Sequence, residues 1–284
     1  MLLRCASRTV DLSTPIVMGV LNVTPDSFSD GGKYQQLDRA IEQATQMAEE
    51  GAGFIDIGGE STRPAAEPVT ETEELRRVIP VIEALVRRIE IPISVDTSKP
   101  NVMRAAVEAG AQLINDVYAL RAPGALEAAQ RSGAAVCLMH MKGEPRTMQL
   151  KPEYQNVVAE VRGFLAERVD ACLKADIAAE RLVVDPGIGF GKQLQHNLAL
   201  LAAIPVWTVR DLPVLIGVSR KSMFGALLDR AVDERLPGAL AAAAASVLAG
   251  ARIIRAHDVR ATVDAIKVAT ALKSAGYRIT SKGE

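Results

Sequence analysis

The chain has 284 residues, 33 of them basic and 34 acidic, so its formal net charge at pH 7 is −1. Because a nucleic-acid partner would favour a basic excess, we expect no such partner. The amino-terminal segment MLLRCASRTV lacks the apolar stretch of a signal peptide, and the three cysteines are too far apart for a disulfide framework or a zinc motif. The longest uncharged run, Leu236–Ala251, is shorter than the roughly 18 residues of a membrane span. We therefore expect a cytoplasmic protein that does not enter the membrane.

Short apolar runs recur along the chain and alternate with longer segments of helical pattern. Leu2–Leu12 comes first and is expected to form a short hairpin or an N-terminal cover. Each of the eight runs that follow leads to a polar or glycine-rich residue, as buried strands do in α/β folds. The runs are Ile16–Leu21, Phe54–Ile57, Ile93–Val95, Leu113-Ile114, Ala135–Met139, Leu182–Val184, Val214–Val218 and Ile253-Ile254.

The segments between these runs carry apolar residues at helical spacing. The pattern is clear in Leu37–Glu50, Glu71–Ile89 and Val157–Leu173, and the alanine-rich run Leu236–Ala251 is expected to be a buried helix. Eight βα units without a break in composition predict one domain over residues 1–284, an α/β protein folded as a (β/α)8 TIM barrel with a short N-terminal hairpin. An open doubly wound sheet is the alternative, although such a sheet would rarely need eight units of this evenness.

Polar side chains stand at the ends of the predicted strands. In a barrel these strand ends meet at one rim, which carries the active site. One polar strand end is ordinary, but a whole set is hard to explain as solvation, so the set predicts a functional site. Its members are Asn22, Asp56, Asp96, Asn115, His140, Asp185, Ser219 to Lys221, Arg255 and His257.

The most informative strand end lies in LVVDPGIGFGK, residues 182–192. The apolar run stops at Asp185, and the proline that follows prevents the strand from continuing. Three glycines then permit a sharp bend and a close approach to a ligand, and Lys192 ends the stretch. A carboxylate in this position predicts a site residue, while a solvated cap of a turn is the alternative.

The strand-end residues divide by charge. Asp96, Asn115 and Asp185 offer hydrogen-bond acceptors and an amide, which suits a heterocycle with N–H groups, such as an aminopyrimidinone. Arg220, Lys221, Arg255 and His257 follow the last two strands, where barrels often bind phosphate. The rim is therefore predicted to bind a polar ring at one side and an anion at the other.

Two long polar loops follow the first two strands. They are Asn22–Lys33 and Gly58–Pro68, and both are rich in Gly, Pro, Ser and Thr. Loops of this length in a compact barrel usually act as functional lids, with a disordered insertion as the alternative. Their hydroxyl groups, with Asn22 and Asp30, could hold a diphosphate and Mg²⁺, which prefers oxygen ligands.

Seven segments of the chain resemble dihydropteroate synthases, in the correct order and over nearly the whole length. The first two, MGVLNVTPDSFSDGG at 18–32 and DIGGESTRP at 56–64, are long and specific. The others are SVDTSK at 94–99, ND at 115–116, DPGIGFGK at 185–192, GVSRK at 217–221 and RAHD at 255–258. The resemblance implies a barrel that joins 4-aminobenzoate to 6-hydroxymethyl-7,8-dihydropterin diphosphate in folate biosynthesis.

The resemblance also implies roles for individual residues. It assigns the pterin ring to Asp96, Asn115, Asp185 and Lys221. It assigns the diphosphate to Asn22, Arg255 and His257, with Thr62 beside it and Asn22 as a ligand of Mg²⁺. It places around 4-aminobenzoate, where sulfonamides also bind in this family, Thr62, Arg63, Pro64, Phe190, Ser219 and Lys221. Lys221, Arg255, His257 and Asp96 form the implied catalytic set, and family members are typically homodimers built through late helices, here Leu236–Ala251.

The implied reaction is consistent with the residues. A diphosphate whose charge is matched by cations leaves easily, and an aromatic amine needs no strong base to attack. His257 is therefore expected to bind an anion, His140 to be structural and His196 to be exposed. Three alternatives remain at this point: a corrinoid methyltransferase, an inactive binding barrel, and an aldolase with Lys221 as its Schiff base.

Overall fold

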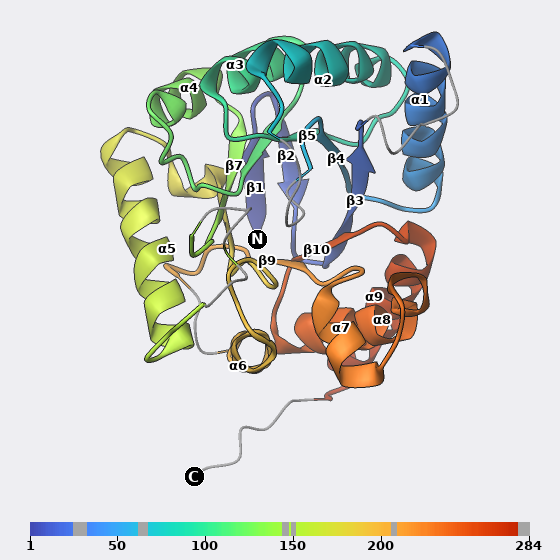
Figure 1. The fold of residues 1–284 in the computed structure, drawn as a ribbon, viewed down its shortest axis with the longest axis vertical. Coiled ribbons are helices and arrows are strands. Elements are labelled where there is room, and N and C mark those ends of the chain that lie inside the picture. Colours follow the sequence, from blue (N-terminus) through green and yellow to red (C-terminus); the bar gives the residue numbers. More distant parts are fainter. Residues whose placement is uncertain (25–32, 62–67, 144–147, 149–151, 206–208, 278–284) are drawn as a thin grey trace.

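A computed structural model describes residues 1–24, 33–61, 68–143, 148, 152–205 and 209–277. Eight strands in it form one parallel sheet, in the spatial order β8-β7-β6-β5-β4-β3-β10-β9. A parallel bridge between Val184 and Val214 joins the two end strands, so the sheet closes into a barrel as predicted (Figure 1). The strands are β3 (Ile16–Asn22), β4 (Phe54–Gly58), β5 (Ile93–Asp96), β6 (Leu113–Asp116), β7 (Ala135–Met139), β8 (Leu182–Asp185), β9 (Leu215–Gly217) and β10 (Ile253–Ala256).

Helices follow the strands and surround the barrel (Figure 1). Within the described part of the chain the α-helices are α1 (Lys33–Glu49), α2 (Glu71–Val86), α3 (Pro100–Glu108), α4 (Ala125–Ser132), α5 (Val157–Lys174), α6 (Leu194–Ala202), α7 (Ser222–Leu228), α8 (Leu236–Ala249) and α9 (Val259–Ser274). Short 3₁₀ helices are η2 (Ala179–Arg181) and η3 (Val232–Glu234). The predicted helices are confirmed, with small shifts at their ends.

The helix ends have local causes. The side chain of Thr70 accepts a hydrogen bond from the backbone N–H of Glu73 and so caps the start of α2. Gly250 takes a positive φ of 117° and ends α8, two residues before the predicted end at Ala251. The predicted buried helix buries one face, through Ala239, Ala243 and Val247, while its other side is partly exposed.

An antiparallel hairpin closes the amino-terminal end of the barrel. Its strands are β1 (Leu2–Cys5) and β2 (Arg8–Asp11), and they lie across the middle of the ring in Figure 1. Leu3, Cys5 and Leu12 are fully buried. They pack in one apolar cluster with side chains from the early part of the barrel strands, including Phe54 and Leu113. The predicted hairpin is therefore confirmed, and its apolar side chains close this end of the barrel.

Polar side chains replace this apolar cluster at the carboxyl ends of the strands. Because side chains alternate between the two faces of a strand, residues two apart point into the same side. Phe54 and Leu113 belong to the apolar cluster, whereas Asp56 and Asn115, two positions later, are buried polar residues. The fold thus brings the predicted polar strand ends together at one rim.

Candidate active site

Arg255, on β10, joins two carboxylates at the centre of the rim. Its Nε donates to Oδ2 of Asp56 at 2.6 Å, and its Nη2 donates to Oδ2 of Asp96 at 2.8 Å. Burial opposes the charge, but the two carboxylates outweigh it and hold the pKa of Arg255 above its ordinary value. The guanidinium is therefore charged, and it links strands β4, β5 and β10.

Asp56 is the fully buried hub of this group. Besides Arg255, it accepts hydrogen bonds from Oγ of Ser94 at 2.6 Å and from Nδ2 of Asn115 at 3.0 Å. The sequence placed Asp56 among the polar strand ends without giving it a role. A charged residue inside the apolar run Phe54–Ile57 was the signal that could have identified it, since such a residue needs a partner when buried.

The two predicted ring-binding carboxylates have raised pKa values. Burial raises the pKa of Asp96 to about 7, although the charge of Arg255 opposes this shift. Burial likewise raises the pKa of Asp185 to about 6, against a hydrogen bond from the backbone N–H of Gly187 at 2.7 Å. Carboxyl groups that lose their protons near neutral pH are typical of functional sites. Asn115 lies in the same group, and its amide donates to Asp56.

Lys221 stands across the seam between β8 and β9 from Asp185. Burial lowers the pKa of Lys221 to about 8, while the charge of Asp185 acts in the opposite direction. Its ammonium lies 4.1 Å from the ring centroid of Phe190, a cation–π contact. Phe190 and Lys221 were both predicted to border 4-aminobenzoate, and the structure brings them into contact.

The end of the rim formed by β9 and β10 presents backbone and side-chain donors. Nδ1 of His257 lies 3.1 Å from Oγ of Ser219, which also accepts from the backbone N–H of His257. Arg220 donates to Asp258 at 3.1 Å and ties the two loops together. Helix α9 begins at Val259, so the positive end of its dipole lies next to His257. This combination suits an anion.

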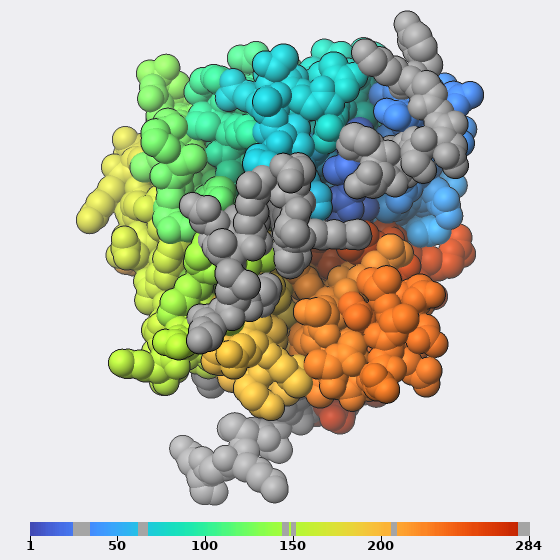
Figure 2. Space-filling view, in the orientation of Figure 1, coloured from blue at the N-terminus to red at the C-terminus, as the bar shows by residue number. Residues whose placement is uncertain are grey.

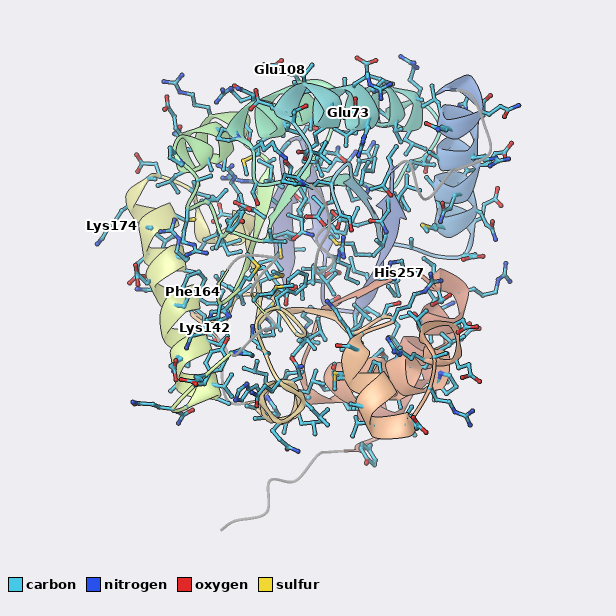
Figure 3. The ribbon with its side chains drawn as sticks, viewed as in Figure 1. Glu73, Glu108, Lys142, Phe164, Lys174 and His257 are labelled. Atoms are coloured by element: carbon cyan, nitrogen blue, oxygen red, sulfur yellow. The ribbon has the colours of Figure 1, made fainter. Side chains whose placement is uncertain are left out.

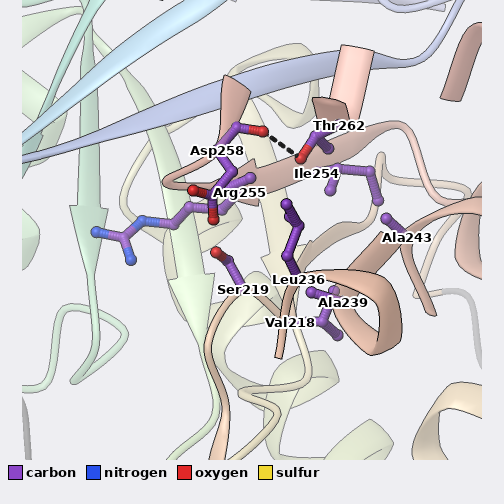
Figure 4. A pocket seen from close by; sticks show the side chains of 10 residues that line it. Val218, Ser219, Leu236, Ala239, Ala243, Ile254, Arg255, Asp258 and Thr262 are labelled. Carbon is purple, nitrogen blue, oxygen red and sulfur yellow. Dashed lines mark hydrogen bonds between the residues drawn. The ribbon is translucent and has the colours of Figure 1, made fainter. Parts of the chain in front are cut away.

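Figure 4 shows Arg255 beside a small pocket near the rim. A small pocket lies between α8 and the last two strands, and Ser219, Leu236 and Ile254 line it. The guanidinium of Arg255 points away from Leu236 and Ile254, toward the carboxylates of the rim. We predicted that Arg255 binds the diphosphate. Its guanidinium lies at the side predicted for the ring, and its role stays a prediction.

Asn22 is the residue predicted to bind Mg²⁺, and that role stays a prediction. It ends β3 beside Gly58, where a Cβ built on the glycine would lie 3.8 Å from Oδ1 of Asn22 and 3.9 Å from Oδ2 of Asp96. Among the described residues no group of three or more His, Cys, Asp or Glu side chains could hold a metal. A single amide oxygen from the protein is consistent with Mg²⁺ that is bound mainly by substrate phosphates and water. It would not suffice for a site made of protein ligands alone.

Some predictions lie outside the described residues, and others need refinement. Thr62, Arg63 and Pro64 belong to the segments that the structure does not describe, as do the central parts of both long loops. His140 is buried, and its structural role stays a prediction. His196 is half-buried in the first turn of α6, where Nδ1 accepts the backbone N–H of Gln193, so it is not the exposed residue that we expected.

Taken together, a (β/α)8 barrel whose strand ends gather carboxylates, an amide and cations defines an enzyme site for a polar ring and an anion. The profile of the family described as "Pterin binding enzyme" matches residues 18–257. The dihydropteroate synthase of Escherichia coli strain K12 is 54% identical over 267 residues, which cover 94% of this chain and 95% of that protein.

Solved structures agree with this match. The dihydropteroate synthase of Yersinia pestis in a complex with a sulfonamide drug has a TM-score of 0.92 and 50% identity, covering 96% of this chain and 100% of the other. The enzyme of Xanthomonas albilineans with 4-aminobenzoic acid has a TM-score of 0.91 and 51% identity, covering 96% and 98%. The chain therefore belongs to the pterin-binding enzyme family, among its dihydropteroate synthases.

Proposed function

We propose that this protein joins 4-aminobenzoate to (7,8-dihydropterin-6-yl)methyl diphosphate, giving 7,8-dihydropteroate and diphosphate in folate biosynthesis. The observation that carries the proposal is the buried group of Asp56, Asp96, Asn115 and Arg255 at the rim of the barrel. A ring with several N–H groups and a carbonyl can exchange hydrogen bonds with this group, which an apolar ligand could not satisfy.

The rim would act mainly by holding charge and geometry. Asp96, Asn115 and Asp185 orient the ring, and Lys221 lies across the seam from Asp185. The bond between the methylene carbon and the diphosphate oxygen breaks, and the amine nitrogen forms the new bond to that carbon. The negative charge that develops on the diphosphate is stabilised by the donors around Ser219, His257 and the start of α9. The proton that the amine releases can pass to the diphosphate or to solvent, so no strong base is needed.

We also propose Mg²⁺ as the cofactor, with Asn22 as its protein ligand. When bound, the ion would neutralise charge on the leaving diphosphate. A diphosphate with Mg²⁺ could order the two long loops and so complete the site for 4-aminobenzoate. If the closed form is a minor state of the free protein, adding pyrophosphate and Mg²⁺ together should raise the affinity for 4-aminobenzoate at least about tenfold. Unchanged affinity by calorimetry would mean that the pocket is preformed.

We propose further that the protein is a cytoplasmic homodimer. The described residues include no helix that is long and apolar enough to cross a membrane, and all three cysteines are free thiols. Four large apolar residues on the late helices are 46–61% exposed: Leu227, Leu228, Val268 and Leu272. The segment with α7 and α8, orange in Figure 2, lies at the surface of the face shown. Sedimentation should give a dimer, and Leu272→Glu should favour the monomer.

One coupled assay tests the proposed reaction. Purified protein is incubated with the pterin diphosphate, 4-aminobenzoate and Mg²⁺, and both pyrophosphate and dihydropteroate are measured. Formation of both products in equal amounts supports the proposal. Release of pyrophosphate without dihydropteroate, or no turnover by a protein that still binds the pterin, would contradict it.

A further inference from the structure

The glycine-rich loop after β8 packs directly on the end of β7. Gly187, Gly189 and Gly191 have φ values of 67°, 82° and 62°, which disfavour any side chain. A Cβ at Gly187 would collide with the carbonyl oxygen of His140, and one at Gly191 with that of Lys142. The loop backbone therefore has little freedom to move toward the end of β7. These contacts restrain one side of the loop, and other contacts must hold the opposite side.

Lys192 supplies these contacts from inside the fold. Its side chain is only 2% exposed, and Nζ lies 2.9 Å from Nδ1 of His140. It also lies 2.9 Å from the carbonyl oxygen of Gly187, 3.0 Å from that of Phe190 and 3.3 Å from that of His140. All four contacts are neutral acceptors. The buried ammonium of Lys192 thus binds the carbonyl groups at both ends of the segment Gly187 to Phe190.

The environment of Lys192 indicates a specific role for this arrangement. Burial lowers the pKa of Lys192 to about 7, so the protein retains a lysine at a position that disfavours its charge. Burial, with the nearby ammonium, also lowers the pKa of His140 to about 3, which keeps the imidazole neutral and able to accept from Nζ. An apolar side chain would fill the same space at lower cost, but it could not bind the carbonyl groups.

The loop that Lys192 holds reaches the candidate site through Phe190. The ring of Phe190 lies 4.1 Å from Nζ of Lys221, and a Cβ on Gly189 would lie 3.0 Å from Cδ of Lys221. Oδ1 of Asn197 accepts the N–H of Gly189 at 2.8 Å. A shift of the Phe190 carbonyl would therefore move the aromatic ring relative to Lys221.

From this geometry we propose that Lys192 is a positioning residue, which fixes Phe190 against Lys221 and thereby shapes the wall of the site for the aromatic amine. Lys192 does not touch the substrate, because it is buried beneath the loop. The inference rests on the proposed function, in which Phe190 borders 4-aminobenzoate and the carboxylates bind the pterin. Lys192 thus contacts neither substrate, but it affects the binding of 4-aminobenzoate selectively.

A comparison of KM values tests the proposal. Lys192→Met keeps the length of the side chain and removes its donors, so the KM for 4-aminobenzoate should rise about tenfold or more. The KM for the pterin diphosphate should change by less than about threefold, because Asp96 and Asn115 lie on other strands and Asp185 belongs to β8, before the loop begins. Lys174→Met, at the exposed end of α5 (Figure 3), is the matched control and should change neither KM.

A double-mutant cycle shows whether Lys192 acts through Phe190. If it does, Phe190→Leu should raise the KM for 4-aminobenzoate in the wild type. In the Lys192→Met background the same substitution should have a smaller effect, and the KM should rise less than about threefold. Independent, multiplicative effects would overturn the proposal, and so would equal rises in both KM values. Wild-type turnover tests the reaction itself, so a wild type without activity would count against the proposed function and not against this inference.

Stability is measured in parallel, because removal of a buried lysine can weaken the fold. Lys192→Gln retains an N–H donor with a shorter reach and should give an intermediate KM for 4-aminobenzoate. It carries the test if Lys192→Met does not fold. Failure of both variants to fold would overturn the proposal, since the lysine would then be required for the fold and not for the shape of one site.

Discussion

The two ends of the barrel interior use the same strands for opposite purposes. At the amino-terminal end, Phe54 and Val183 are fully buried and pack under the hairpin. Two positions later on the same strands stand Asp56 and Asp185, which are also buried but carry carboxyl groups. A distance of two residues therefore separates a layer that stabilises the fold from a layer whose burial costs free energy.

The contrast indicates which layer is needed for folding and which for activity. Apolar burial stabilises without directional requirements. The polar layer needs specific partners, and Arg255 meets part of that need by joining Asp56 to Asp96. A ligand with complementary donors can supply the remaining hydrogen bonds. Substrate binding would then offset the free-energy cost of burying the polar layer.

The largest expected effect comes from weakening the apolar end. Phe54→Ala should lower the free energy of unfolding by about 3–5 kcal/mol, because it leaves a cavity beneath the hairpin. The protein that remains folded should keep its affinity for the pterin. Chemical denaturation and calorimetry on the same preparation measure the two quantities. Loss of pterin affinity in the folded fraction would show that the two layers are coupled.

At the polar end, Asp185→Ala should do the reverse. Removal of a charged partner from a buried hydrogen-bonded pair costs about 2–5 kcal/mol of binding free energy, so pterin affinity should fall at least about tenfold. Stability should not fall comparably, since burial already disfavours the charged form of Asp185. Near-normal pterin affinity by calorimetry would refute the role of this carboxylate.

A third prediction separates two parts within the polar end. His257→Ala should weaken pyrophosphate binding about tenfold, through loss of a donor beside the start of α9. It should leave the affinity for a pterin without a diphosphate nearly unchanged. Asn115→Ala is the matched variant, because it should weaken the binding of that pterin and spare pyrophosphate. Equal losses for both ligands in either variant would contradict the division.

The smallest expected effect is a dependence of pterin affinity on pH. Asp96 has a pKa raised to about 7, so the free protein holds this proton below that pH and must release it to accept N–H groups. Affinity should therefore rise with pH, by about fivefold from pH 6 to 7 and about twofold more from pH 7 to 8, and then level off. Asp96→Asn should flatten this part of the profile. A flat profile in the wild type would mean that the protonated carboxyl binds the ring.

Much of the fold could be predicted because it depends on patterns that are local in the sequence. The run Leu182–Val184 and the proline after Asp185 predicted the end of β8, and the stripe in Glu71–Ile89 predicted α2. The ring of polar strand ends followed from the common direction of parallel strands. These predictions are confirmed because strand burial and helix periodicity act over a few residues.

The partners of individual side chains could not be predicted in this way. Arg255 contacts Asp56, 199 positions earlier in the chain, and nothing local to either residue indicates that pairing. In the sequence Lys192 only marks the end of this loop, because lysine side chains are rarely fully buried. Its burial depends on His140 and on the turn that the glycines allow, so it follows from tertiary packing and not from the sequence pattern.

The closure of the barrel has a consequence for its local motions. Strand β9 has three residues. Among the described residues, its link to β8 is the bridge between Val184 and Val214, just before β9, with the N–H of Val184 donating to the carbonyl oxygen of Pro213. Fewer ladder hydrogen bonds hold this seam than the other strand pairs, so local opening should cost least there. Amide hydrogens around Val184 and Leu215 should exchange with solvent faster than those of β4 and β5. Because Asp185 and Lys221 flank the same seam, a bound pterin ring would bridge it and slow that exchange.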